Sequence, residues 1–104
     1  MYRQGDVLIV PIRAMPKNVK AMGREKGRAV LAHGEATGHA HTVRDARAAL
    51  FSDPRTMEVF MLVGGDDPVA LEHEEHNTIN IPAGAYQIVR QREYSPGAVR
   101  NVAD

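Results

Sequence analysis

The chain contains no cysteine among its 104 residues. Disulfides, thiolate zinc sites, iron–sulfur clusters and cysteine nucleophiles are therefore excluded, and any metal ion must be bound by nitrogen and oxygen donors. No apolar run approaches the roughly 20 residues that a membrane-spanning helix needs. The first residues also lack the pattern of a secretory signal. These absences predict a cytoplasmic protein without a membrane partner.

Neither sign of charge is in excess, because 13 basic side chains balance 13 acidic ones. The two signs are unevenly distributed along the chain: most charged side chains of residues 1–30 are basic, whereas most of those in residues 31–86 are acidic. This asymmetry could orient the protein toward an anionic partner or a second copy of itself, and ion pairs across the fold account for it equally well. The few aromatic residues do not alternate with basic ones, so nucleic-acid binding is not predicted.

Short apolar segments recur between turn residues, and no helical pattern is long enough to pack alone. Strands are expected at residues 5–12, 29–33, 39–44, 57–63, 69–73, 78–82 and 85–94, and residues 46–51 fit either a strand or a helical turn. A basic loop is expected near residues 14–28, and one terminal helical turn at Ser95-Pro96. The spacing predicts a single all-β domain over residues 1–104, a small β-barrel or sandwich. A domain this small favours a homo-oligomer.

Four of the five histidines form two close pairs, His39-Ala40-His41 and His73-Glu74-Glu75-His76. Residues two apart on a strand project from the same face, so His39 and His41 point the same way. Val43 shares that face, which directs both rings toward the interior if Val43 belongs to the core. Burying two neutral imidazoles together is explained by chelation of one divalent cation. Structural hydrogen bonds, or pairing with surface glutamates, remain the alternative.

The second pair is placed by the register of a hairpin. An odd-numbered loop aligns Val69 and Leu71 with Ile79 and Ile81, whereas a two-residue loop would set apolar side chains beside polar ones. His73 then continues the inward face and His76 lies in or beside the turn, so His73 is the better ligand of the two.

Acidic and basic residues near these histidines suggest further roles. Glu74 or Glu75 could act as a general base on a metal-bound water, and Glu75 is the candidate catalytic residue, although the same pair could simply keep a turn soluble. Arg90 and Arg92 could bind a small anionic ligand, a carboxylate or phosphate, at the lip of a pocket, or protect an exposed edge strand. No nucleophile elbow, phosphate loop or dinucleotide fingerprint is present, so the sequence assigns no reaction.

The motifs around these histidines resemble those of the cupins, small β-barrels that often hold a divalent metal. Gly34 followed by His39-Ala40-His41 and Asp45 is similar to the first cupin motif, in which the acidic ligand is usually Glu. Pro82-Ala83-Gly84 is similar to the second motif, with Gln87 in the place of its histidine ligand and Gln91 in the place of its Asn. The resemblance implies that His39, His41 and Asp45 are metal ligands. The chain also resembles small uncharacterised bacterial or phage proteins.

Two hypotheses follow. The first is an all-β domain that binds one divalent transition metal (Zn, Ni, Fe or Cu), its activity unassigned. Its ligands are His39, His41 and His73, completed by one residue from a set comprising Asp45, Glu35, Glu75 and His76. The second is a non-catalytic, oligomeric binding or assembly module, phage- or host-encoded, in which the histidines are structural.

Overall fold

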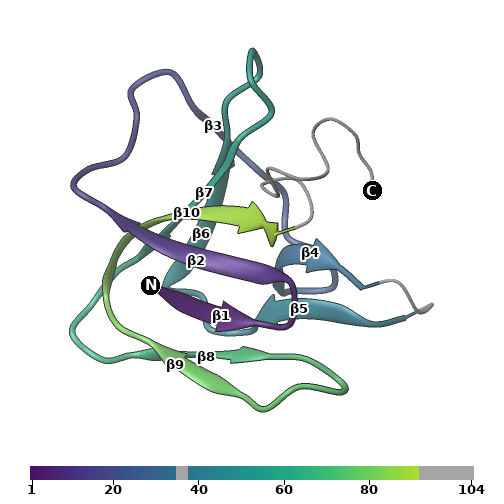
Figure 1. Ribbon diagram of the computed structural model, residues 1–104. Coiled ribbons are helices and arrows are strands. Elements are labelled where there is room, and N and C mark those ends of the chain that lie inside the picture. Colours follow the sequence, from purple (N-terminus) through teal and green to yellow (C-terminus); the bar gives the residue numbers. More distant parts are fainter. Residues whose placement is uncertain (35–37, 92–104) are drawn as a thin grey trace.

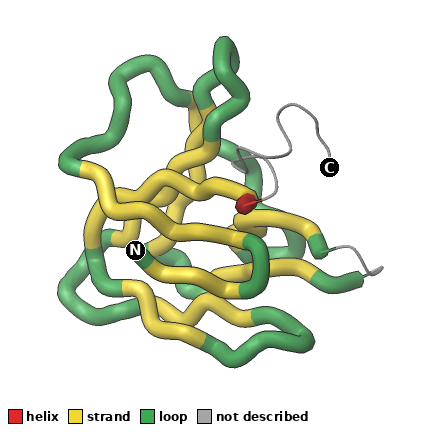
Figure 2. Tube along the Cα trace, viewed as in Figure 1, coloured by secondary structure: helices red, strands yellow, loops and turns green. Residues whose placement is uncertain are grey.

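The fold of residues 1–34 and 38–91 is described from a computed structural model (Figure 1). Figure 2 shows strands joined by loops and turns through residues 1–34 and 38–90. The strands are β1 (Tyr2–Gln4), β2 (Val7–Ile12), β3 (Lys20–Ala21), β4 (Ala29–His33), β5 (Ala40–Val43), β6 (Ala48–Ser52), β7 (Val59–Val63), β8 (Val69–Glu72), β9 (Ile79–Ile81) and β10 (Gly84–Arg90). No helix within these described ranges is long and apolar enough to cross a membrane.

The strands form two antiparallel sheets. The larger sheet has the order β1-β2-β10-β7-β6-β3, and the smaller has the order β4-β5-β8-β9. In Figure 1, β8 and β9 of the smaller sheet lie at the bottom of the view, below β1 and β2 of the larger one. The prediction of an all-β fold is confirmed, and of the two architectures predicted the sandwich is the one observed, since the sheets do not close into a barrel.

The core lies between the two sheets, because alternate residues of each strand face inward. The β8–β9 register, which pairs Val69 with Ile81 and Leu71 with Ile79, places four apolar side chains on one face. This is the odd-loop register predicted from the sequence. The larger sheet contributes Val7, Ile9, Ala48, Leu50, Met61, Val63, Tyr86 and Ile88 to the core, and the smaller sheet contributes Ala29, Leu31, Val43, Val69, Leu71 and Ile81.

Two strands were not predicted. The first, β1, is short and half polar, and it pairs with β2 across a two-residue turn made by Gly5 and Asp6. Gly5 has a φ of 61°, a conformation that glycine adopts without strain and that suits the first position of such a turn. Gly5-Asp6 is recognisable in the sequence as a turn, but the polar residues before it show no alternation typical of a strand.

The second unpredicted strand, β3, lies within the basic loop and pairs with the end of β6. The guanidinium of Arg24 ties this loop to the sandwich by donating a hydrogen bond to the carbonyl oxygen of Ala48 in β6 (2.7 Å), and it also donates to the carbonyl oxygen of Gly27 within the loop (3.0 Å). The loop expected near residues 14–28 is therefore interrupted by a short paired segment.

The last described strand, β10, occupies the centre of the larger sheet between β2 and β7. β10 as a whole is therefore not an edge strand, but its pairing with β7 ends at Ile88, and Arg90 pairs with Val7 of β2. The interpretation of residues 90–94 as an exposed edge strand stays a prediction. Tyr86 and Ile88 are both buried, and each is paired with β2 on one side and with β7 on the other. Residues 92–94 of the predicted strand and the helical turn at Ser95-Pro96 lie outside the described residues.

Candidate metal centre

The pairing of β5 with β8 brings the two histidine pairs together. Thr42 lies opposite Glu72 and Val43 opposite Leu71, and continuing this register by one residue places His41 opposite His73. The two ring centroids are 4.3 Å apart. Val43 is fully buried and His41 is 2% exposed, so the face shared by these two residues does point inward, as the spacing predicts.

His39 and His76 complete a cluster of four rings. The ring of His39 lies 5.7 Å from that of His73 and meets it edge-on. The ring of His76, from the β8–β9 loop, lies 4.7 Å from His73 and 6.1 Å from His41. The structure therefore brings together all four histidines that the sequence singled out as ligands.

These rings line a pocket of about 480 Å³ at one end of the smaller sheet. The lining residues are Gly5, Asp6, Gly34, His39, His41, His73, Glu75, His76 and Arg90. Gly5 belongs to the β1–β2 turn, and a Cβ atom there would lie 2.7 Å from Nε2 of His76. Because glycine has no side chain, the His76 ring can occupy this space.

His41 is the most enclosed member of the cluster. Its Nδ1 lies 2.9 Å from Oε1 of Gln4, a residue of β1 that is itself 3% exposed. Burial, and then the neighbouring His73, lower the pKa of His41 to about 4. The ring is therefore neutral near pH 7, and a neutral imidazole is the form that binds a metal ion.

Two glutamates of the β8–β9 loop lie beside the rings. Glu74 accepts a hydrogen bond from the backbone N–H of Ala40 (2.9 Å), which lowers the pKa of its carboxyl group. One ligand atom each from His39, His73 and Glu74 lie within 4.8 Å of one another, a separation compatible with a shared ion. Glu75, the candidate catalytic residue, lines the pocket 3.8 Å from Nδ1 of His39, but its side chain is 68% exposed.

Arg90 places a positive charge at the wall of the pocket. Its guanidinium donates to the carbonyl oxygen of His33 (2.9 Å) and to the carboxylate of Asp6 (3.3 Å). The prediction that Arg90 lies at a pocket lip agrees with this position, whereas Arg92 lies outside the described residues. A small anionic ligand at Arg90 would have to compete with the Asp6 carboxylate.

Residues 3–91 match the model of a protein family described as a domain of unknown function, DUF8820. The chain belongs to this family. No curated protein and no solved structure matches the chain.

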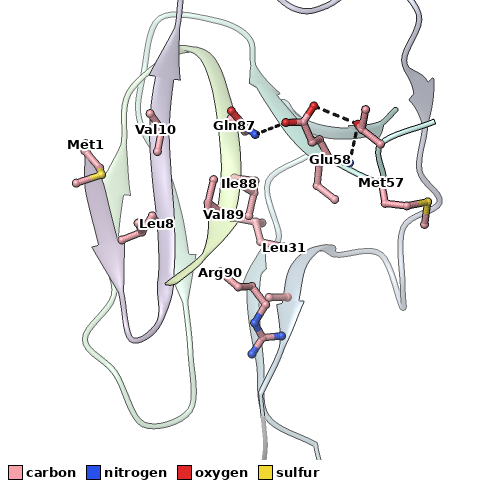
Figure 3. Close-up of a pocket in the computed structure, with 13 residues that line it drawn as sticks. Met1, Leu8, Val10, Leu31, Met57, Glu58, Gln87, Ile88, Val89 and Arg90 are labelled. Atoms are coloured by element: carbon pink, nitrogen blue, oxygen red, sulfur yellow. Dashed lines mark hydrogen bonds between the residues drawn. The ribbon is translucent and has the colours of Figure 1, made fainter. Parts of the chain in front are cut away.

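A second pocket of this DUF8820 domain, about 890 Å³ in volume, lies against the strands of the larger sheet (Figure 3). Most of the side chains that line it are apolar, among them Leu8, Val10 and Ile88. Gln87 also lines it, with its amide donating to Glu58 at 3.1 Å. Gln87, which stands where the cupins have a histidine ligand, therefore lies apart from the four histidines.

Asp45 is not brought to the cluster. Its carboxylate accepts hydrogen bonds from the backbone N–H and the guanidinium of Arg47, both at 2.9 Å, and these bonds hold the pKa of Asp45 below its usual range. The interpretation of Asp45 as a metal ligand is not supported by this position, because its oxygens are already paired at the start of β6. Glu35, another candidate, lies outside the described residues.

Sequence reasoning missed Gly5 and Asp6, which line the pocket from the β1–β2 turn, and Gln4, which contacts His41. They reach the histidines only because β1 packs over the end of β8, as the bond from Gln4 to the Leu71 carbonyl shows (2.9 Å). No spacing along the chain relates residues so far apart. The Gly5-Asp6 turn was the single local signal available.

Proposed function

We propose that this protein binds one divalent transition-metal ion in the pocket lined by His39, His41, His73 and His76. The observation that carries the proposal is the convergence of four of the five histidines on a single pocket: His41 lies in β5, His39 directly before it, and His73 and His76 in the β8–β9 loop. Histidines that served only to pair with surface glutamates would have no reason to gather, because close imidazoles disfavour one another's protonation.

The spacing of the rings supports this function. Two imidazoles bound to one tetrahedral zinc ion through Zn–N bonds of about 2.0–2.1 Å have ring centroids about 5 Å apart. The centroid separations in the cluster run from 4.3 Å to 6.1 Å, on both sides of that value. Among the described residues, His39, His73 and Glu74 already have ligand atoms within 4.8 Å of one another.

The charge around the pocket also favours a cation. Asp6 and Glu75 line the pocket and Glu74 lies beside it, whereas Arg90 is the only basic residue among the lining residues. Imidazole-rich sites without thiolates suit Zn, Ni, Fe or Cu better than Mg or Ca. His41 and His73 are the central ligands in this account, with His39, His76 or Glu74 completing the coordination.

The cupin resemblance supports the same proposal through one of its two motifs. The His39-x-His41 motif supplies rings to the pocket, but Gln87 and Asp45 do not, and His73 and His76 stand in their place. Glu75 is exposed beside His39 and would be close enough to accept a proton from a water molecule in the pocket. Hydrolytic chemistry of that kind would require one coordination position to stay open.

Metal analysis of tag-free protein, followed by titration calorimetry with Zn²⁺, Ni²⁺ and Co²⁺, tests the proposal. We expect one ion per chain in the wild-type protein and none in the His39→Ala/His41→Ala double variant, because that variant removes two of the converging rings. His33→Ala is the matched control: His33 lies outside the pocket, is 66% exposed and faces Glu25 at 3.3 Å. This control should keep the full stoichiometry.

Two results would contradict the proposal. One is a wild-type protein that takes up no ion in the titration and melts at the same temperature with and without chelator. The other is equal loss of metal in His33→Ala and in the double variant. An oligomer that dissociates in salt and ignores chelator would favour the assembly module instead.

A further inference from the structure

The side-chain amide of Gln4 is buried between the two sheets and makes three hydrogen bonds of 2.9 Å. Its Nε2 donates to the carbonyl oxygens of Leu71 and Asn77, and its Oε1 faces Nδ1 of His41. Carbonyl oxygens only accept, so the two donors of the amide are both used on Leu71 and Asn77. The orientation of the amide is therefore set by these partners, and its oxygen must be the atom that faces the histidine.

This arrangement determines which nitrogen of His41 carries the proton. The amide oxygen of Gln4 has no hydrogen to donate, so Nδ1 of His41 must be the donor in their contact. A neutral imidazole has one N–H, which leaves Nε2 of His41 with its lone pair unprotonated. Nε2 is then ready to bind an ion without the loss of a proton or a change of tautomer.

We propose that Gln4 is a positioning residue of the metal site, holding the His41 ring in the Nδ1–H form so that Nε2 is its coordinating atom. This inference rests on the proposed function. Metal-bound histidines generally donate their second ring N–H to an oxygen acceptor, which orients the ring and raises its basicity. Gln4 supplies that acceptor from the opposite sheet.

A neutral His73 ring is in the opposite tautomer. Its Nδ1 accepts a hydrogen bond from the backbone N–H of Glu75 (3.0 Å), so a neutral His73 ring carries its proton on Nε2. Binding an ion through Nε2 requires that bond to be given up, whereas His41 needs no such change. Of the two rings that face each other across β5 and β8, His41 is therefore the one prepared for the ion.

Gln4 also steadies the segment that carries the other two rings. Leu71 lies in β8 and Asn77 directly follows His76 in the β8–β9 loop, so the two donor bonds of one amide flank the segment that contains His73 and His76. A variant at Gln4 has two separable effects, on the tautomer of His41 and on the loop.

Nitrogen-15 NMR of the histidine side chains in metal-free protein tests the tautomer directly, because protonated and unprotonated ring nitrogens differ widely in chemical shift. We expect Nδ1 of His41 to be protonated and Nε2 unprotonated in the wild-type protein. A His41 ring with the proton on Nε2 would overturn the inference, whatever the metal titration shows.

Zinc titration of variants tests the consequence. Gln4→Met should weaken zinc binding by about 10–100-fold, and Gln87→Met, which alters the glutamine of the other pocket, should leave the affinity unchanged. Gln4→Glu separates the two effects: its carboxylate still accepts from Nδ1 of His41 but cannot donate to the Leu71 and Asn77 carbonyls.

We expect Gln4→Glu to keep the Nδ1–H form and to bind zinc more tightly than Gln4→Met. Equal losses in both variants would show that Gln4 acts through the loop alone and would overturn its role in positioning His41. A wild-type protein that binds no zinc would refute the proposed function, and this role of Gln4 with it, while an Nδ1–H signal would still confirm the contact with Gln4.

Discussion

His41 is buried beside several polar and titratable neighbours: Gln4 at its Nδ1, the rings of His73 and His76, and the charges of Asp6 and Arg90. Burial makes protonation of this ring costly, and the adjacent rings add to the cost when they are charged. The same burial that keeps His41 available as a ligand therefore makes the folded state sensitive to acid.

The free energy of unfolding of the metal-free protein should fall as the pH drops from about 6.5 to about 4. The pKa of His41 is about 4 in the folded protein against 6.5 in the unfolded chain, so the unfolded chain binds more protons in this window. Stability is then fully present above pH 6.5, and up to about 3 kcal/mol of it is lost toward pH 4. Urea unfolding in chelator across this pH range measures the effect.

His41→Asn isolates this contribution, because an asparagine amide can still donate to Oε1 of Gln4 but does not titrate. We expect a shallower pH dependence in His41→Asn than in the wild-type protein, and an unchanged dependence in His33→Asn, whose ring is exposed. Identical pH profiles for all three proteins would show that His41 does not behave as a buried neutral ring.

At the scale of single residues, the spacing of the histidines was informative. His39 and His41 were placed on one inward face because strand residues alternate, and Val43 is buried as that argument required. Glu74 was predicted to be a general base or a residue that keeps a turn soluble, not a metal ligand, yet its carboxylate lies with His39 and His73. Its contact with the N–H of Ala40 depends on the pairing of β5 with β8, which no local pattern reveals.

Among the elements, the β1–β2 hairpin contributes Gly5 and Asp6 to the lining of the pocket. Its turn residue Gly5 combines a positive φ of 61° with an approach to His76 that leaves no room for a side chain. Glycine is therefore needed at this position for two reasons, the positive φ of the backbone and the contact with the His76 ring. Comparing substitutions at Gly5 and at Gly27 separates the two.

Gly5→Ala should lower the free energy of unfolding by about 1–2 kcal/mol, the cost of a left-handed residue with a Cβ atom. It should also weaken metal binding, because the new methyl group displaces the His76 ring. Gly27→Ala is the matched control: its φ is 78°, but no atom lies within 4 Å of the added Cβ. Chemical denaturation and zinc titration measure the two effects.

Both variants should lose stability to a similar degree, and Gly5→Ala alone should lose zinc affinity. Full zinc affinity in Gly5→Ala would mean that His76 is dispensable to the site. A loss of affinity in Gly27→Ala as well would mean that the effect comes from general destabilisation.

The register of neighbouring elements could be predicted where one face of a hairpin is apolar. Residues 69–73 and 78–82 allowed one alignment that buried Val69, Leu71, Ile79 and Ile81 together, and that alignment is observed. β3 could not be predicted, because two exposed residues in a basic segment have no alternation to detect. The central position of β10 depends on partners that lie far away in the sequence.

On the scale of the whole molecule, the pocket lies where the two sheets meet. The four histidines belong to the smaller sheet and its loop, whereas Gln4, Asp6 and Arg90 come from the larger sheet and its turn. Gln4 reaches across to β8, and Arg90 reaches across to the end of β4. The all-β class followed from the recurrence of short apolar segments, but the division into two sheets, and so the composition of the pocket, depends on long-range pairings.

Anomalous diffraction from crystals of the zinc-loaded protein tests the central claim most directly. We predict one strong zinc peak in the pocket, with Nε2 of His41 at about 2.0–2.1 Å from the ion, further ligands from His39, His73, His76 or Glu74, and Nδ1 of His41 still bonded to Gln4. Zinc bound only at His33 and Glu25, or a pocket without a peak in crystals grown with saturating zinc, would contradict the account.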